Sequence, residues 1–353
     1  MTIDKAGKMR QEDALDKELI GKFLTENLTE FSITKTIEIL QFPSGASNLT
    51  YEIKGDNQSL ILRTSPAGAN IKSAHDMGRE YKVLSRLISH FPYCPKPLAY
   101  CDDRAILDRP FYVMEKVTGM IPRRDMPVTL SESQHTELCK NLVDVQVKLH
   151  GVDIVEKGLI ELGKPEGYVS RQISGWCDRF QKARTDDVPN GKTLMSWLME
   201  NQPADSYSNP DSASFIHNDY KFDNLVLDRE QPTKIISVLD WEMSTVGDPL
   251  MDLGCSLAYW IEAGDSDELE MIRMQPTNLK GMMTRDQVVD YYLQQSGRTV
   301  ANFNYYYVFG LFRLAVIAQQ IYKRFKEGKT SNTKFANFGK VCTILLSECK
   351  KYT

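Results

Sequence analysis

Hydrophobic and polar positions alternate differently in the two parts of the chain. Before about residue 120, short runs rich in β-branched and aromatic residues predict strands rather than long helices. The expected strands are Thr36–Phe42, Thr50–Ile53, Leu60–Arg63, Lys96–Cys101 and Phe111–Val117. Apolar residues at helical spacing predict two helices in the same part, Asp13–Leu28 and Ser73–Ser89. These elements indicate a small antiparallel sheet with helices packed on it.

From Ser131 onward, the helical period dominates. The expected helices are Ser131–His150, Tyr168–Lys182, Lys192–Glu200, Pro249–Glu262, Arg285–Gln295, Phe303–Phe325 and Thr333–Lys350. Short apolar runs at Ser214–Ile216, Leu225–Asp228 and Ile235–Leu239 predict brief buried strands among them. The pattern therefore predicts an α+β protein, with a small antiparallel β lobe followed by a larger, mainly helical lobe.

Composition narrows the class of protein. The chain has 353 residues, 42% of them hydrophobic, so it can bury a large core. Its net charge of −4 is modest and suggests no nucleic-acid partner. The seven cysteines form no CxxC pair, which argues against zinc and favours reduced thiols. The N-terminal stretch is rich in charged residues and lacks the apolar core of a signal peptide. The apolar run 305–318 is too short to span a membrane and carries Arg313. We therefore expect a cytoplasmic protein without a membrane partner.

The spacing of His217, Asp219, Asn224 and Asp240 carries the candidate chemistry. Phosphoryl transfer needs a base for the attacking hydroxyl and hard oxygen ligands for Mg²⁺. Asp219 is the candidate catalytic base, and Asn224 and Asp240 are the candidate metal ligands, with Asp240 delivered by a β-rich run. Asn and Asp are also common turn formers, but a lone turn does not explain the whole spacing. The pattern favours a kinase.

Several further segments match one known family. The chain resembles the aminoglycoside phosphotransferase-like kinases, which are relatives of the protein kinases, and within them it is similar to the kinase domain fused to acyl-CoA dehydrogenases in animals. The resemblance runs from about Phe42 to about Trp260. It rests on 217–224, 240–242 and the segments 73–81, 111–115, 168–173 and 238–249. It implies a bilobal protein-kinase-like fold, with a nucleotide-binding lobe at 1–117 and a helical lobe at 118–353 holding the catalytic loop and acceptor site.

The resemblance also implies where a nucleotide binds. The segment 45–51 matches the family's G-x-S-N-x-T-Y loop, so Ser47 and Asn48 are expected at the phosphates. Arg63 stands where most kinases have a phosphate-gripping lysine, and Glu80 is its expected ion-pair partner. An exposed arginine beside a helix glutamate is the alternative for that pair. ATP, possibly GTP, with Mg²⁺ is the expected cofactor.

Adenine is expected to bind backbone groups of Glu115 and Val117 after a strand. His150 and Asp153, three apart at a helix end, are expected to bond backbone groups and fix the loop that carries the catalytic residues, rather than to act on substrate. Asp252, at the start of the helix that begins at Pro249, is expected to brace the catalytic loop rather than to bind metal. Asp248 is expected to cap the helix that starts at Pro249.

The acceptor side is less constrained by sequence. Tyr220 and Lys221 follow the catalytic aspartate, and Arg171 and Trp176, together with Arg179, lie on one predicted helix that could meet an anionic acceptor. These helix residues could equally be core and solvated surface. The resemblance favours a small hydroxyl acceptor, a hydroxy acid or hydroxyacyl-CoA. An aminoglycoside kinase and a nucleotide-binding pseudokinase remain alternatives, and no feature of the sequence indicates an oligomeric state.

Overall fold

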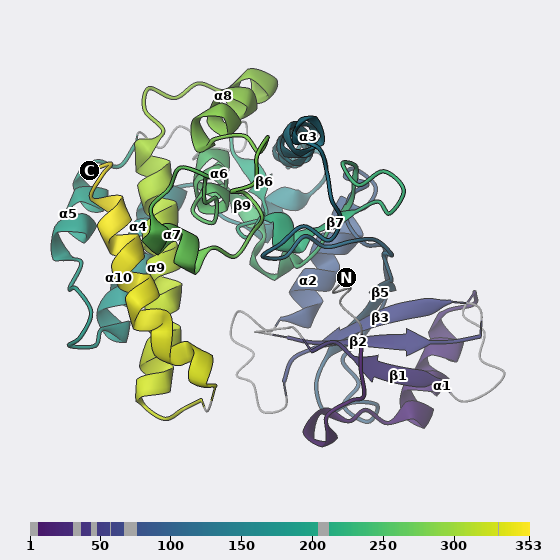
Figure 1. Cartoon of the computed structure of the whole chain (residues 1–353). Helices are drawn as coiled ribbons and strands as arrows, with labels where there is room; N and C mark the ends of the chain where they lie inside the picture. The colour runs from purple at the N-terminus through teal and green to yellow at the C-terminus, as the bar shows by residue number, and fades with distance from the viewer. Residues whose placement is uncertain are drawn as a thin grey trace. The chain divides into compact units, whose positions relative to one another are not determined.

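The computed structural model describes residues 6–30, 37–43, 48–56, 58–66, 76–203, 212–330 and 332–353. The chain forms two compact units (Figure 1). The first unit comprises Met1–Ile121 and Asn224–Met243, and the second comprises Pro122–Asp223 and Ser244–Thr353. The predicted α+β class is confirmed. The functional division at residue 117 stays a prediction.

The first unit is built on a five-stranded antiparallel sheet, shown in purple and blue in Figure 1. Its strand order is β1-β2-β3-β5-β4, and the five predicted strands are all present. Their bounds are β1 Glu38–Gln41, β2 Leu49–Lys54, β3 Ser59–Thr64, β4 Pro97–Cys101 and β5 Phe111–Glu115. The two predicted helices are shorter than expected, α1 at Lys17–Asn27 and α2 at Met77–Leu87. A short 3-10 turn, η1 at Gln11–Asp13, precedes α1.

Side-chain alternation gives the sheet two different faces. On β3, Leu60 and Leu62 belong to the hydrophobic core that includes α1, and on β5 Phe111 packs edge-on against Phe23 of α1 at 5.1 Å between ring centroids. Successive side chains of a strand point to opposite faces. Arg63 therefore points away from that core, toward α2.

The segment 224–243 completes the first unit. It starts at the last residue of the 3-10 turn η3, Phe222–Asn224, and contains the hairpin strands β7 at Leu225–Leu227 and β8 at Ile235–Val238 and the 3-10 turn η4 at Trp241–Met243. Met120 exchanges two backbone hydrogen bonds with Leu227, at 2.9 and 2.7 Å. A Cβ on Gly119 would lie 2.3 Å from Val226 and 2.4 Å from the Leu227 carbonyl, so this contact requires glycine.

The second unit is mainly helical. Its helices are α3 Glu132–His150, α4 Tyr168–Ala183, α5 Lys192–Glu200, α6 Pro249–Leu257, α7 Asp267–Ile272, α8 Arg285–Ser296, α9 Asn304–Lys326 and α10 Phe338–Cys349. Short elements join them: η2 Leu159–Leu162, η5 Thr333–Asn337 and the antiparallel pair β6 Ser214–Ile216 and β9 Thr245–Gly247. The sequence pattern missed α7, and α6 ends five residues earlier than expected because Tyr259 and Trp260 donate to carbonyls only three residues back.

Helix α9 lies at the centre of the second unit. It crosses α6 at two glycines, where a Cβ on Gly310 would lie 2.1 Å from the Gly254 carbonyl oxygen. The backbones therefore approach more closely than any side chain would allow, and α10 packs along α9 (Figure 1). Within the described ranges, no helix is long and apolar enough to cross a membrane. All seven cysteines are buried free thiols.

Candidate active site

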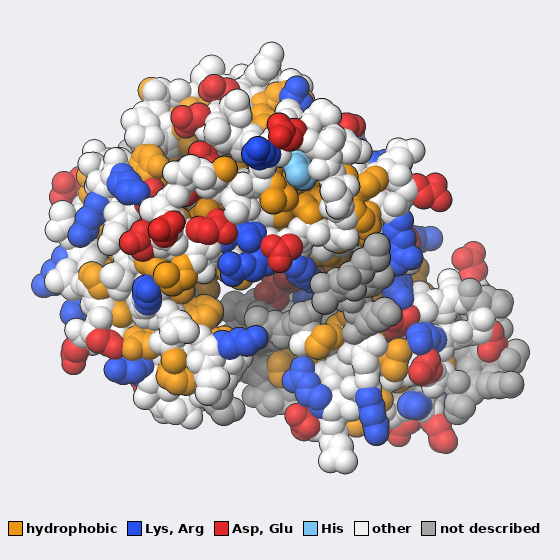
Figure 2. Space-filling view, in the orientation of Figure 1, with side chains coloured by type: hydrophobic (Ala, Val, Ile, Leu, Met, Phe, Trp, Pro, Cys, Tyr) orange, Lys and Arg blue, Asp and Glu red, His pale blue; other side chains and the backbone are white. Residues whose placement is uncertain are grey.

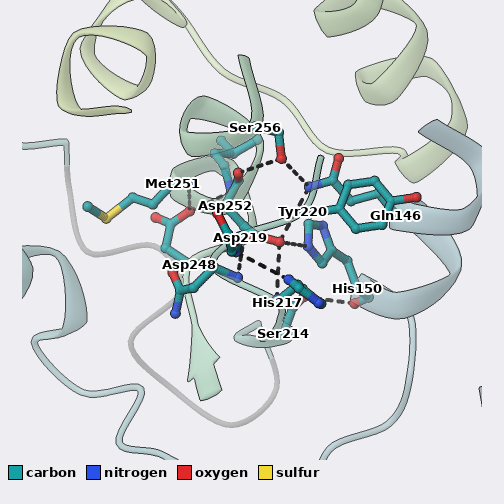
Figure 3. A network of polar contacts seen from close by, with 12 residues as sticks. Gln146, His150, Ser214, His217, Asp219, Tyr220, Asp248, Met251, Asp252 and Ser256 are labelled. Carbon is teal, nitrogen blue, oxygen red and sulfur yellow. Dashed lines mark hydrogen bonds and ion pairs between the residues drawn. The ribbon is translucent and has the colours of Figure 1, made fainter. Parts of the chain in front are cut away.

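The loop that follows β6 is held by one buried carboxylate, Asp252 of α6 (Figure 3). Its side chain is fully buried. Its Oδ1 accepts the amide of Asn218 at 2.6 Å, and its Oδ2 accepts the amide of His217 at 3.3 Å. Asp252 therefore fixes the backbone immediately before Asp219. Burial would raise the pKa of Asp252, but the hydrogen bonds from His150 and from the amide of Asn218 help to lower it.

His150, at the end of α3, is the second support of this loop. Its Nε2 lies 3.0 Å from Asp252 Oδ2, and its Nδ1 lies 2.7 Å from the hydroxyl of Tyr292 on α8. Burial lowers the pKa of His150 although Asp252 opposes the shift, which favours the neutral ring. A neutral ring that donates from Nε2 and accepts at Nδ1 satisfies both partners. The bracing role expected for Asp252 is confirmed, as is the capping role of Asp248, whose Oδ1 accepts from Leu250 and Met251. His150 supports the loop through the side chain of Asp252 rather than through backbone groups, and Asp153 instead accepts the amides of Val155 and Glu156 in its own turn.

The loop itself has an unusual backbone. Asn218 has φ +63°, a left-handed conformation that non-glycine residues rarely adopt. Its side-chain oxygen accepts the hydroxyl of Tyr168 at 3.2 Å, and the amide of Asp219 donates to Nδ1 of His217 at 3.2 Å. The contacts of Asn218 and of the Asp219 amide therefore hold the orientation of Asp219.

The carboxylate of Asp219 is paired with Lys221. The Lys221 ammonium lies 2.7 Å from each carboxylate oxygen and 4.7 Å from the centre of the Tyr259 ring. Both side chains keep some solvent access, 20% for Asp219 and 14% for Lys221. Burial alone would lower the pKa of Lys221, but Tyr259 and Asp219 raise it, so the lysine is a cation. The pair presents a partly accessible carboxylate beside a fixed positive charge.

In the first unit, Arg63 forms the centre of a second polar cluster. Its guanidinium donates to Oε1 of Glu80 at 2.8 Å and to Oδ1 of Asp240 at 2.9 Å. The predicted Arg63–Glu80 ion pair is confirmed, and it is buried rather than exposed, with Glu80 in the apolar stripe of α2. Burial would lower the pKa of Arg63, but Glu80 and Asp240 raise it well above its usual value. Burial raises the pKa of Glu80 despite Arg63.

The backbone segments that carry Asp240 and Asn224 lie side by side. The amide of Leu239 donates to the Asn224 carbonyl at 2.7 Å, so the residue before Asp240 lies beside Asn224. Asp240 has φ +66° and its side chain is 36% exposed. An amide oxygen and a carboxylate are donors that Mg²⁺ accepts, and Mg²⁺ usually needs just one or two carboxylates besides phosphate oxygens. The two residues fit that role, although the described residues include no cluster of three or more His, Cys, Asp or Glu side chains suited to a metal.

The remaining nucleotide candidates have mixed positions. Ser47 lies outside the described residues. Asn48 is buried, and its side chain donates to Glu242 at 2.6 Å. The amide of Glu115 donates to the Lys96 carbonyl at 2.9 Å, so a base contact from Glu115 would use its carbonyl oxygen. Val117 is partly exposed in the connector.

The acceptor candidates also separate. Tyr220 is 1% exposed and donates its hydroxyl to the Leu142 carbonyl at 2.7 Å, which places it in the core. Arg171 is exposed and donates to the backbone carbonyls of Glu166 and Lys164. Trp176 is 7% exposed and faces two guanidinium groups. Lys221 is the candidate that lies directly on Asp219.

Sequence reasoning missed four residues of the second unit that complete this region. They are Tyr168, Tyr259, Tyr292 and Arg313. Their contacts join segments more than thirty residues apart, which periodicity does not connect. Arg313 did carry a signal: it is a charged residue in the middle of the most apolar segment of the chain.

Comparison with known proteins assigns the chain to a family. Residues 38–282 match the model of the phosphotransferase enzyme family. Mouse acyl-CoA dehydrogenase family member 10 is 32% identical over 332 residues, which cover 94% of this chain and 30% of that protein. The chain thus spans about a third of the length of this relative.

Solved structures agree in fold. A candidate aminoglycoside phosphotransferase from Ralstonia eutropha superposes with a TM-score of 0.81 at 27% identity, covering 96% of this chain and 98% of that one. A choline kinase from Cryptosporidium parvum gives 0.62 at 15% identity, covering 95% and 96%. These likenesses confirm the α+β, protein-kinase-like fold class. The chain belongs to the phosphotransferase enzyme family.

Proposed function

We propose that this phosphotransferase is an ATP- and Mg²⁺-dependent kinase that phosphorylates a hydroxyl group of a small molecule. The observation that carries the proposal is the geometry at Asp219, whose backbone is fixed through Asp252 and His217 and whose carboxylate is partly accessible beside Lys221. A general base needs such a fixed, reachable carboxylate. Asp219 accepts the proton of the acceptor hydroxyl, and Lys221 holds the carboxylate in place and adds positive charge.

Asn224 and Asp240 are the residues that would hold Mg²⁺. When bound, the ion neutralises charge on the phosphates. Arg63 is the proposed phosphate-binding cation, and its pairing with Glu80 holds its fork in one orientation. The segment around Ser47 and Asn48 is the proposed phosphate loop.

The carbonyl of Glu115 and the backbone of Val117 are the proposed contacts of the base. Because backbone groups would make these contacts, the side chains at these two positions do not indicate which purine binds. ATP is the proposed donor, with GTP as the alternative.

For the acceptor, we favour a hydroxy acid or a hydroxyacyl-CoA. The supporting observations are the relatedness to acyl-CoA dehydrogenase family members and the cations Lys221 and Arg313 near Asp219. An aminoglycoside is a second candidate, favoured by the likeness to the Ralstonia protein. A pseudokinase is the third, favoured by arginine at position 63.

The test is an Asp219→Asn variant assayed beside wild type with MgATP and four acceptor classes: hydroxy acids, their CoA thioesters, aminoglycosides and amino alcohols. Loss of the base should lower turnover by about 10²–10⁴-fold. Thermal stabilisation by MgATP should persist, since Asp219 is not a nucleotide residue in this proposal. Asp286→Asn, on the exposed first turn of α8, is the matched control.

Normal turnover by Asp219→Asn would remove the proposed base. Binding of MgATP by wild type without phosphorylation of any acceptor would favour the pseudokinase. A preference for aminoglycosides over all hydroxyacyl compounds would reverse the proposed order of acceptors.

A further inference from the structure

A buried cation lies in the middle of α9. Arg313 is 6% exposed and follows the glycine crossing of α9 with α6 by one turn. Placing an arginine in a protein interior is costly unless other groups stabilise its charge. Its neighbours include the ring of Trp176, 5.3 Å from the guanidinium carbon to the ring centre, and the thiol of Cys255 on α6.

Arg313 links two cation–aromatic contacts of the second unit: it packs on Trp176, and its charge acts on Tyr259, the ring beneath Lys221 of the catalytic loop. We define the cation–aromatic row as Lys221, Tyr259, Arg313, Trp176 and Arg179. Lys221 packs on Tyr259 at 4.7 Å, and Trp176 receives both Arg313 and Arg179, the latter at 4.7 Å. These residues come from four segments: the catalytic loop, the stretch after α6, α9 and α4.

Exposure changes along the cation–aromatic row. Arg313 and Trp176 are buried, Tyr259 is partly exposed, and Arg179 is exposed at the far end. The row therefore connects the neighbourhood of Asp219 with the surface of α4. Cation–π contacts stabilise each positive charge without neutralising it.

The charge of Arg313 persists in this setting. Burial alone would lower its pKa, but Cys255, Tyr259 and Asp219 raise it above its ordinary value. Lys221 bonds Asp219 directly, whereas Arg313 acts on the same carboxylate through its charge. A guanidinium packed on a ring keeps its N–H donors in its own plane, the geometry that binds a carboxylate or a phosphate.

Resting on the function proposed above, we propose that Arg313 is a specificity-determining residue of the acceptor site, where it binds an anionic group, a carboxylate or a phosphate, of the molecule whose hydroxyl reaches Asp219. Trp176 holds the guanidinium in position, and Arg179 extends the positive charge outward. A polycationic acceptor would meet Lys221, Arg313 and Arg179 with repulsion. This deepens the proposed function by naming the residue that reads the acceptor's charge.

The test compares matched acceptors on wild type, Arg313→Gln, Arg313→Lys and the control Arg324→Gln, an exposed arginine of the same helix. The probes are 3-hydroxyhexanoate, its neutral amide and 3-hydroxyhexanoyl-CoA. A lost charge-assisted hydrogen bond corresponds to roughly a 10–100-fold change in binding. Arg313→Gln should therefore raise KM about 10–100-fold for whichever anionic probe wild type phosphorylates. KM for the amide should change by less than about threefold, and KM for MgATP should not change.

The free acid and the thioester distinguish the source of the anion. If Arg313→Gln raises KM for the free acid, Arg313 binds a carboxylate. If it raises KM for the thioester instead, Arg313 binds the phosphates of the CoA carrier. Arg313→Lys keeps the charge and should retain part of the preference for the anionic probe over the amide, so it tests the proposal if Arg313→Gln does not fold. Equal losses with anionic and neutral probes, in either variant, would overturn it.

Calorimetry of the same probes on the nucleotide-free protein separates this inference from the proposed function. If wild type phosphorylates nothing but binds an anionic probe and Arg313→Gln does not, the kinase proposal fails and the anion site stands. If wild type binds the amide as tightly as both anionic probes, the anion site fails even though phosphorylation is observed.

Discussion

Asp240 of the first unit and Asp252 of the second are both held by side chains from distant segments, yet their surroundings differ in kind. Asp252 is fully buried, and its donors are two backbone amides, a neutral histidine and Gln146. Asp240 is 36% exposed, has a left-handed backbone and takes its bond from a cation, Arg63. A buried carboxylate such as Asp252, with neutral donors, holds a loop in place. An accessible carboxylate such as Asp240, beside a cation, can accept a second cation or exchange the first for another.

Charge is distributed accordingly. On the face seen in Figure 2, the described basic and acidic side chains are interspersed, without one sign dominating. Concentrated charge is instead internal, at Arg63 with Glu80 and Asp240 in the first unit and at Lys221 with Asp219 in the second. Such internal charges are retained where chemistry or structure requires them, because each costs desolvation free energy.

The sharpest way to break the comparison is to remove each carboxylate. Asp252→Ala leaves two loop amides and His150 without their acceptor, so it should lower the free energy of unfolding by about 3–5 kcal/mol. Urea denaturation measures this value. Asp286→Ala, at an exposed position of α8, is the control. A loss below about 1 kcal/mol for Asp252→Ala would mean that the loop does not depend on Asp252.

Asp240→Ala should show the opposite profile. Its exposed side chain makes the expected change in unfolding free energy about 1 kcal/mol or less. Turnover should fall by about 10²–10³-fold if Asp240 is a metal ligand that stabilises the transferring phosphoryl group. Raising Mg²⁺ should recover part of the loss at Asn224→Ala, which keeps the charged ligand Asp240, and less at Asp240→Ala, which keeps only the neutral amide of Asn224. Turnover of Asp240→Ala within threefold of wild type would contradict the assignment.

Sequence periodicity anticipated the strands of the sheet and most helices, because each of these elements records its own burial in its spacing. Periodicity did not anticipate the pairing of Arg63 with Glu80, which was expected from the resemblance to the kinase family. It did not anticipate that Arg63 also bonds Asp240, or that Tyr220 is a core residue and Tyr292 supports His150. Those contacts join segments far apart in the chain, which leave no local period.

Arg63→Lys tests whether the fork of the guanidinium matters. A lysine is a point charge and is less suited to holding Glu80 and Asp240 in one geometry. Losing one charge-assisted hydrogen bond, about 1.5 kcal/mol, should raise KM for MgATP about tenfold while kcat changes less. Steady-state kinetics with varied MgATP measure both. Arg109→Lys, in the same unit but bonded to the Ser65 carbonyl, is the control.

His150→Gln sharpens the account of Asp252 through pH. The pKa of His150 is lowered on folding, so the unfolded chain binds the proton more readily. The stability from the neutral ring is therefore fully present above about pH 6.5 and is lost as the pH falls from there toward the lower folded value. The free energy of unfolding of wild type should rise with pH in this window, by at most about 1.4 kcal/mol per pH unit from this residue.

Glutamine cannot titrate but can still donate to Asp252, so His150→Gln should have a flatter dependence between about pH 5 and 6.5 and match wild type in slope above it. His90→Gln, at an exposed histidine, separates this effect from the simple loss of a titrating ring. A wild-type curve that falls relative to that of His150→Gln as the pH rises through this window would show that His150 is charged in the folded protein. Asp252 would then be held by a cation, as Asp240 is, and the contrast between the two carboxylates would reduce to their exposure.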